Sequence, residues 1–357
     1  MVGAQSRRRG PAQLPTRRGD VSTKAAVIGA GSWGTAVAAI VATNADAVLW
    51  ARDPVVAAAV TDEHRNPRYL PDVALPVRLR ATTSLEDACT GADVVVMGVP
   101  SHGFRDVLGL AAPSIGAEVP IVSLAKGVEQ ATLLRMTEVV ADVLSDHRRD
   151  MIGVLTGPNL AREVAAAEPT ASVVAFEDAA TAEQLQHLLM TATFRVYTNP
   201  DVVGCEIAGA LKNVIALGAG IAHGLGYGDN TKAALITRGL AELARLGISL
   251  GGDPLTFSGL AGLGDLVATC TSEKSRNRTV GVALGQGRAL EDIVAETRMV
   301  AEGVKSTEAV LALARRQGIE MPIAEQVGAV LYEGRNPADI VPALMLREAK
   351  PELRGMR

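Results

Sequence analysis

A single lysine interrupts a long apolar stretch in the second half of the chain. Lys212 is the only charged residue between positions 207 and 222. A helix that is apolar on most of its faces is buried, and a buried lysine needs a partner. Burial also lowers the pKa of an ammonium group, which suits a general acid or base. Together with Asn213, Lys212 therefore indicates proton transfer at a carbonyl group, unless its side chain extends to the surface.

Two segments downstream carry groups that could complete such a site. A glycine-rich turn at 259–264 leads to Asp265, whose carboxylate could hold the ammonium and accept from a substrate hydroxyl, or could cap the next helix. Residues 274–278 read Lys-Ser-Arg-Asn-Arg, a basic cluster able to neutralise a phosphate through charge-assisted hydrogen bonds. Taken alone, this cluster is more typical of a solvated loop.

Near the start of the chain, three glycines predict a dinucleotide site. Gly29, Gly31 and Gly34 form the pattern GxGxxG between an apolar run at 24–28 and an Ala/Val-rich stretch at 33–43. In a strand–turn–helix unit the glycines allow a tight turn, the approach of a pyrophosphate and close packing of helix on strand. The phosphates then lie at the helix N-terminus, whose amides favour anions. A glycine-rich turn without a ligand is the alternative.

The choice of cofactor is expected at the end of the second strand. An acid there binds a ribose 2′-hydroxyl, whereas an arginine accommodates a 2′-phosphate. The sequence reads Trp-Ala-Arg-Asp at 50–53 and offers both groups. Because Arg52 comes first, we expect NADPH to be preferred and NADH to be accepted. A solvated surface arginine is the alternative for Arg52.

Three further polar segments follow apolar runs. In open α/β sheets ligands bind at the carboxyl ends of the strands. Lys126 follows one such run and is a good candidate, and Gly157 and Asn159 follow another. His102 follows a third run, where it could act as the base in another type of dehydrogenase or cap a helix.

The elements that would position these groups change in character along the chain. Strands are predicted at 24–28, 47–51, 93–99, 120–124, 152–155, 171–176 and 194–197. Helical stretches alternate with them, which predicts an α/β fold with a doubly wound Rossmann-type domain. Beyond the turn at 199–201, helices are predicted at 206–224, 231–248, 279–287, 306–317 and 322–332, without any strand. We expect a basic tail (1–20), a dinucleotide-binding domain (21–200), an all-helical substrate and catalytic domain (201–345) and a C-terminal tail (346–357), with the site between the domains.

Composition excludes several classes of protein. The 357 residues carry a net charge of −4, so the chain as a whole is not a nucleic-acid binder. Three scattered cysteines argue against a disulfide framework or a metal site and favour a reducing cytoplasm. The stretch at 207–222 is short for a membrane span and contains Lys212. Residues 1–20 hold five arginines, one acid and no apolar core, which predicts a disordered tail or an early start codon rather than a targeting peptide.

Taken together, these segments resemble the bacterial-type NAD(P)-dependent glycerol-3-phosphate dehydrogenase family. The strings that carry the resemblance span about residues 24–332: GAGSWGTA, VLWARD, YLPDVALP, VPSH, LAKGVE, GPNLARE, EIAGALKNVIA, GYGDNTKAALITRGLAE, GLAGLGDLVATC, SRNR and VAEGVKS. The resemblance implies hydride transfer between NAD(P)H and the pair dihydroxyacetone phosphate and sn-glycerol 3-phosphate, supplying the latter for phospholipid synthesis. A homodimer is compatible with it.

The resemblance also implies roles for individual residues. Lys212 is the proton donor and acceptor, oriented by Asp265 and Asn213. The substrate is lined by Lys126, Gly157, Asn159, Lys212, Asp265, Ser275, Arg276 and Asn277. Besides the three glycines, the cofactor is bound by Ser32, Trp33, Arg52, Lys126, Ala161, Arg276, Val300 and Glu302. One departure is Asn159, where the family commonly has Ser or Thr.

Two rival functions fit parts of the sequence. Reductases of the β-hydroxyacid or ketopantoate kind also combine a Rossmann domain with a helical lysine, but the basic cluster around Arg276 argues for a phosphorylated substrate. A non-catalytic NAD(P)-binding sensor need not keep Lys212 together with Asp265.

Overall fold

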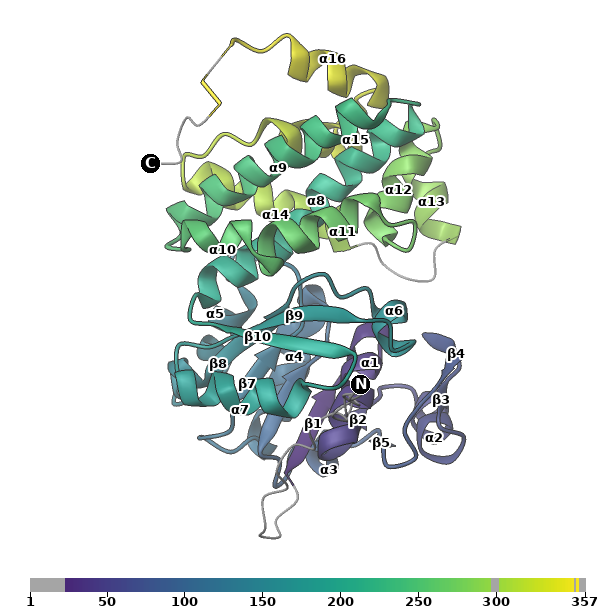
Figure 1. Ribbon diagram of the computed structural model, residues 1–357, viewed down its shortest axis with the longest axis vertical. Coiled ribbons are helices and arrows are strands. Elements are labelled where there is room, and N and C mark those ends of the chain that lie inside the picture. Colours follow the sequence, from purple (N-terminus) through teal and green to yellow (C-terminus); the bar gives the residue numbers. More distant parts are fainter. Residues whose placement is uncertain (1–22, 297–301, 350, 353–357) are drawn as a thin grey trace, which may run out of the picture.

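An eight-stranded sheet forms the amino-terminal part of the molecule (Figure 1). The computed structural model describes residues 23–296, 302–349 and 351–352. The strand order is β10-β9-β8-β7-β6-β1-β2-β5. The bounds are β1 Lys24–Ile28, β2 Asp46–Trp50, β5 Arg80–Thr82, β6 Val94–Met97, β7 Ile121–Ser123, β8 Ile152–Thr156, β9 Thr170–Ala175 and β10 Phe194–Asn199. This confirms the predicted Rossmann-like α/β fold.

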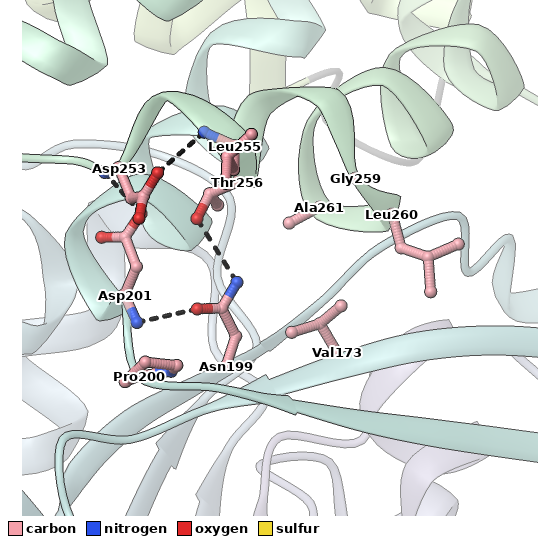
Figure 2. Close-up of a pocket in the computed structure, with 10 residues that line it drawn as sticks. All are labelled: Val173, Asn199, Pro200, Asp201, Asp253, Leu255, Thr256, Gly259, Leu260 and Ala261. Atoms are coloured by element: carbon pink, nitrogen blue, oxygen red, sulfur yellow. Dashed lines mark hydrogen bonds between the residues drawn. The ribbon is translucent and has the colours of Figure 1, made fainter.

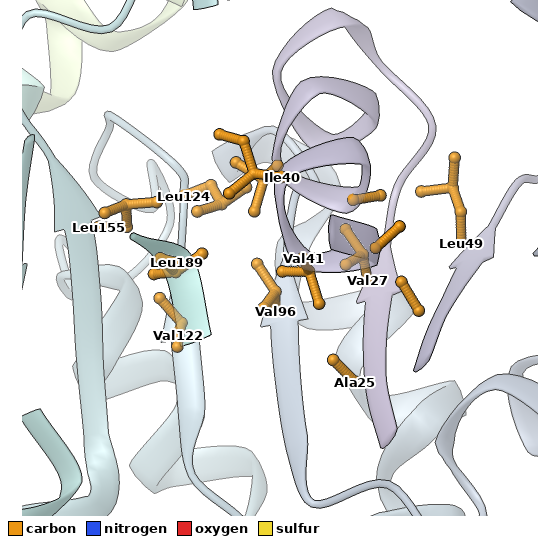
Figure 3. Packing of buried hydrophobic residues seen from close by; sticks show 14 of the residues in the cluster. Ala25, Val27, Ile40, Val41, Leu49, Val96, Val122, Leu124, Leu155 and Leu189 are labelled. Carbon is orange, nitrogen blue, oxygen red and sulfur yellow. The ribbon is translucent and has the colours of Figure 1, made fainter. Parts of the chain in front are cut away.

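Helices cover both faces of the sheet because its strands are apolar on both sides. Along β1, Ala25 and Val27 join one buried cluster, and Ala26 and Ile28 join the opposite one. Figure 3 shows the first cluster, with Val41 of α1 beside Val27 and Val96. It lies under α1 Ser32–Asn44, α2 Pro54–Asp62, α6 Ala161–Ala165 and α7 Ala179–Leu189, and the second lies under α3 Leu85–Cys89, α4 Ser101–Ala111 and α5 Met136–Val143. Short 3₁₀ turns follow at η1 Ala112–Ser114 and η2 Arg149–Met151.

The strand order reverses at β1, which places a binding crevice there. β1 pairs in parallel with β2 on one side and with β6 on the other. Ligands of open α/β sheets bind outside the carboxyl ends of the strands at such a reversal. The glycine motif follows β1 directly, so the predicted dinucleotide loop stands at this crevice.

The sequence prediction missed two features of the sheet region. β9 runs antiparallel to β8, although its apolar run resembles those of the parallel strands, because an apolar pattern does not encode strand direction. The strand β5 and the hairpin of β3 Arg65–Asn66 and β4 Leu70–Ala74 were also missed. These strands are short and only partly buried, so they lack the apolar runs that marked the others.

The second part of the molecule is helical throughout its described residues (Figure 1). Its elements are α8 Val202–Gly224, α9 Asp229–Ser249, α10 Pro254–Ser258, the π-helical turn η3 Leu260–Gly264, α11 Asp265–Thr271, α12 Arg276–Gly285, α13 Leu290–Glu296, α14 Glu302–Arg316, α15 Pro322–Tyr332, η4 Pro337–Asp339 and α16 Ile340–Met345. Several begin three or four residues before their predicted starts. Asp201 caps α8 and Ser275 caps α12, which adds a first turn to each.

Helix α8 is the centre of this part. It is long and apolar enough to cross a membrane, but 94% of its most apolar window is buried inside the protein, as in the core helix of a helical domain. Helices α9, α11, α12, α14 and α15 pack around it. Gly220 and Gly281 let α8 and α12 approach closely, since a Cβ on Gly281 would lie 2.2 Å from the Leu217 carbonyl oxygen. This approach brings the polar residues of the two helices together.

The predicted domain division at residue 200 falls in the short connection between β10 and α8. A pocket at this connection is shown in Figure 2. Asp201 accepts hydrogen bonds from Gly204 N at 2.7 Å and from Asp253 N at 2.8 Å, and Asn199 donates to Thr256 Oγ1 at 3.3 Å. The ten residues that line the pocket include two acids and no base, so it does not suit an anionic ligand. The predicted tail at 1–20 lies outside the described residues.

Candidate active site

Lys212 lies inside the helical part and not at its surface. Only 6% of the residue is exposed, which rules out the alternative of a side chain extended into solvent. Its ammonium donates to Asp265 Oδ1 in a very short contact and to Thr269 Oγ1 at 2.9 Å. Asp265 and Thr269 are one turn apart on α11, so both face α8. The ammonium of Lys212 on the apolar helix α8 is therefore paired with the carboxylate of Asp265 on α11.

Burial changes the acid–base chemistry of this lysine. Desolvation lowers the pKa of Lys212 from 10.5 to about 7, and the charge of Lys126 adds to the lowering, whereas Asp265 opposes it. An acid with a pKa near the working pH can both give and take a proton. The lowered pKa of Lys212 agrees with the effect of burial that we expected from the sequence.

Asp265 is shared with a second lysine that comes from the sheet side. Lys126 Nζ donates to Asp265 Oδ2 at 2.8 Å, to Asn159 Oδ1 at 2.6 Å and to the Gly157 carbonyl oxygen at 3.1 Å. Asp265 does not cap a helix with its side chain, because it is the first residue of α11 and Gly264 holds the cap position. The alternative interpretation of Asp265 as an N-cap is therefore wrong.

Two asparagines extend the polar network along α8 and α12. Asn277 Nδ2 donates to Asn213 Oδ1 at 2.9 Å, and Asn213 Nδ2 donates to the Lys126 carbonyl oxygen at 3.3 Å. Asn277 Oδ1 also accepts from Gly303 N at 2.9 Å, next to Glu302. Burial raises the pKa of Glu302, and the nearby charges of Arg276, Lys126 and Lys212 oppose the rise. Glu302 is therefore close enough to these three cations to feel their charges.

The basic cluster at 274–278 is divided by the start of α12. Ser275 is buried and caps the helix by accepting from Arg278 N at 3.3 Å. Lys274 points elsewhere and pairs with Glu163 at 2.9 Å. Arg276 is the first helical residue and is exposed, one position before the buried Asn277. The cluster is thus not a single solvated loop, because Lys274 lies in the turn before α12 and residues 276–278 belong to the helix.

The glycine motif has the geometry that a dinucleotide requires. Gly29 has a φ of +117°, a conformation that favours glycine. A Cβ on Gly34 would lie 2.0 Å from the Gly29 carbonyl oxygen, whereas a Cβ on Gly31 would project into open space. No side chain caps the start of α1, whose cap position is Gly31. This open helix N-terminus fits a pyrophosphate.

Other predicted cofactor residues lie around the same loop. Ser32 is the first residue of α1, and its hydroxyl donates to the Tyr69 carbonyl oxygen at 3.1 Å. Trp33 packs near Phe194, with its indole Nε1 buried and without a hydrogen-bond partner in the described part of the chain. Ala161 begins α6, which packs on α1. Val300 lies outside the described residues.

Arg52 and Asp53, the two charged residues that follow β2, differ in their contacts with the rest of the protein. Arg52 is exposed at the carboxyl end of the strand. Asp53 caps α2, since its Oδ1 accepts from Val55 N at 2.9 Å, and its Oδ2 pairs with Arg68 at 3.2 Å. Arg52 is therefore open to solvent, whereas Asp53 is held by the protein.

Comparisons with known proteins agree along nearly the whole chain. The sequence pattern of the NAD-dependent glycerol-3-phosphate dehydrogenase N-terminus matches residues 24–182, and that of the C-terminus matches residues 201–342. The chain belongs to this family. A glycerol-3-phosphate dehydrogenase (NAD(P)+) of Thermobifida fusca is 53% identical over 338 residues, covering 94% of this chain and all of the relative. One from Streptomyces griseus is 54% identical over 332 residues, covering 93% and 98%.

A solved structure extends the likeness to three dimensions. The crystal structure of glycerol-3-phosphate dehydrogenase from Coxiella burnetii superposes with a TM-score of 0.87 at 39% identity, covering 91% of this chain and 99% of that chain. Membership of the glycerol-3-phosphate dehydrogenase family separates the chain from the rival reductases and makes it an NAD(P)-dependent oxidoreductase. No group of His, Cys, Asp or Glu in the described residues could hold a metal ion.

Sequence reasoning did not single out two polar residues, one that contacts Lys212 and one that precedes Gly157. Thr269 accepts from Lys212 and was not singled out, although its spacing of four residues from Asp265 on a helix was a usable signal. Thr156 ends β8 with a buried hydroxyl that has no partner among the described residues. The Nδ2 of Asn159 is likewise buried and unpartnered there. His102, in contrast, is exposed on α4, and no hydrogen bond or ion pair within the described part of the chain joins it to the Lys212 network.

Proposed function

We propose that the protein interconverts dihydroxyacetone phosphate and sn-glycerol 3-phosphate, with Lys212 as the acid–base group. The observation that carries the proposal is the buried ammonium of Lys212, which has a lowered pKa and is held by Asp265, the carboxylate that also pairs with Lys126 after β7. The two curated relatives of 53–54% identity bear this activity in their names. The product is a precursor for phospholipid synthesis, which we take to be its use.

The chemistry follows from the positions of the side chains. When bound, the nicotinamide supplies the hydride that reduces the carbonyl carbon. The Lys212 ammonium polarises the carbonyl oxygen and donates its proton as negative charge develops there, leaving a neutral amine. Asp265 and Thr269 fix the direction of the donated proton, because both accept from the same ammonium. In the oxidative direction the neutral amine takes the proton from the hydroxyl.

Substrate oxygens have suitable partners around Lys212. Lys126 brings a second positive charge to the site, and the unpartnered Nδ2 of Asn159 offers a buried donor. Arg276, beside Asn277, is our candidate for the phosphate group, with Ser275, Asn277 and Gly157 completing the lining. Binding energy from a phosphate remote from the carbonyl can position the reacting atoms.

We further propose that NADPH is preferred over NADH. Arg52 is exposed where it can meet a 2′-phosphate, while the neighbouring carboxylate of Asp53 is engaged as a helix cap and in an ion pair. Gly29, Gly31 and Gly34 would hold the pyrophosphate at α1, with Ser32, Trp33 and Ala161 around it. The three cysteines are free and buried, which fits the reducing cytoplasm as the place of action.

A spectrophotometric assay tests the proposed function. NADPH absorbance should fall when dihydroxyacetone phosphate is added to the purified protein, and it should not fall with ketopantoate. Turnover of ketopantoate at a comparable rate would overturn the substrate assignment. Binding of NADPH without turnover of any carbonyl compound would leave the protein as a nucleotide sensor.

A further inference from the structure

The hairpin of β3 and β4 is attached to the dinucleotide loop by side chains that the sequence analysis did not use. Asn66 is fully buried, and its Nδ2 donates to the Ala30 carbonyl oxygen at 3.0 Å and to Thr35 Oγ1 at 2.8 Å. Ser32 closes the same contact by donating to the Tyr69 carbonyl oxygen. The two residues between Asn66 and Tyr69 are thus held beside the glycine loop.

Arg68 stands on this segment and reaches the end of β2. Its backbone N–H donates to Asn66 Oδ1 at 3.3 Å, and its guanidinium lies over the Tyr69 ring at 5.5 Å. From there it pairs with Asp53 Oδ2 at 3.2 Å. The glycine loop and the end of β2 are neighbours, since Gly29 N donates to the Trp50 carbonyl oxygen at 3.1 Å. Arg68 therefore lies at the end of β2, where the protein would contact the 2′-position of a bound adenosine.

The pair with Arg68 changes what Asp53 can do. A carboxylate after the second strand of such a domain accepts from a ribose 2′-hydroxyl and repels a 2′-phosphate. In this protein both oxygens of Asp53 already accept hydrogen bonds, one from Val55 N and one from Arg68. The positive charge of Arg68 also offsets the negative charge that would face a phosphate next to Arg52.

We propose that Arg68 is a specificity-determining residue that favours NADPH by holding and neutralising Asp53. It is a positioning residue, because it acts through Asp53. This inference rests on the proposed use of NADPH and adds a second determinant to Arg52. Both partners are partly exposed, with 60% of the Arg68 side chain and 39% of the Asp53 side chain accessible. The effect is therefore modest, about three- to fivefold in affinity.

A double-mutant cycle separates this role from direct contact with the phosphate. The dissociation constants of NADPH and NADH are measured by calorimetry, without a carbonyl substrate, for Arg68→Ala, Asp53→Asn and the double variant. The substitution by Asn keeps the cap of α2, because asparagine is as good an N-cap as aspartate. We expect Arg68→Ala to weaken NADPH about three- to fivefold and to leave NADH unchanged or tighter. In the Asp53→Asn background the same substitution should have no effect.

A matched control removes the same charge from the other end of β2. Arg78 pairs with Asp46 at 3.1 Å and is also 60% exposed, and Arg78→Ala should leave both dissociation constants unchanged. Arg68→Lys should retain the wild-type ratio. Equal losses of NADPH affinity in the wild-type and Asp53→Asn backgrounds, no change in Arg68→Ala, or an equal loss in Arg78→Ala would each overturn the proposal. Turnover of dihydroxyacetone phosphate by the wild type tests the proposed function separately.

Discussion

Lys126 and Asp265 join the two parts of the molecule by an ion pair of 2.8 Å in which both side chains are largely buried. Lys126 follows the sheet strand β7, and Asp265 begins the helix α11. The same carboxylate holds Lys212 with its other oxygen. Two lysines therefore compete for one acid, and the state of one affects the acidity of the other.

The first prediction concerns this competition. Lys126→Ala removes a positive charge that lowers the pKa of Lys212. It also leaves Lys212 as the only lysine that pairs with Asp265. Each of these two effects should raise the pKa of Lys212. The midpoint of the pH profile of kcat should move upward by about one pH unit at saturating substrates, and kcat should fall. A midpoint that stays in place or moves downward would show that Lys126 does not tune Lys212.

The second prediction is the pH dependence of the wild type. Burial lowers the pKa of Lys212 to about 7, so its protonated fraction falls as the pH rises through that value. Reduction of dihydroxyacetone phosphate uses the ammonium and should slow above this pH, whereas oxidation of sn-glycerol 3-phosphate uses the amine and should slow below it. Rates of both directions are measured across the range. Parallel profiles in the two directions would contradict the assignment.

The third prediction addresses cofactor choice at Arg52. Arg52→Ala should weaken NADPH much more than NADH, because only NADPH carries the 2′-phosphate. A well-aligned charge-assisted contact is worth about 1.5–3 kcal/mol, and solvent exposure should reduce this toward the lower limit. The Michaelis constants for both cofactors provide the measurement. If both constants rose by the same factor, Arg52 would not read the 2′-position.

The fourth prediction uses the substrate phosphate to test Arg276. Arg276→Ala should lower kcat/KM for dihydroxyacetone phosphate by about 2 kcal/mol or more, since remote binding energy positions the carbonyl. Dihydroxyacetone, which lacks the phosphate, serves as the control and should be a poor substrate that the substitution hardly affects. An equal loss with both substrates would place Arg276 at the cofactor or in the fold, and no loss would make it a surface residue.

Some of the site was predictable because the sequence isolates its residues. Lys212 stands out as one charge in an apolar helix, and Gly29, Gly31 and Gly34 are marked by their spacing between strand and helix. All the parallel strands except β5 were found from short apolar runs, which burial on both faces demands. At these positions the local sequence pattern and the packing of the whole fold call for the same residue types.

Other features depend on contacts that no local pattern encodes. Lys126 and Asp265 are 139 residues apart in sequence, so their shared position arises only when the sheet and helices pack together. The antiparallel pairing of β9 with β8 is also a property of the assembled sheet, which the apolar run of β9 does not encode. Asp53 was one of two candidates for reading the 2′-position, and no local pattern predicted that Arg68, fifteen residues later, pairs with its carboxylate.

The most direct test of the account is the turnover of Lys212→Ala. The variant should lose nearly all reduction of dihydroxyacetone phosphate while binding NADPH within a few-fold of the wild type, because the lysine donates the proton and lies in the helical part. Lys212→Arg should fail as well, since a guanidinium does not release its proton at working pH. NADPH binding by calorimetry and the near-ultraviolet circular dichroism of the variants show that the fold is kept. A Lys212→Ala enzyme with near-normal kcat would contradict the central claim.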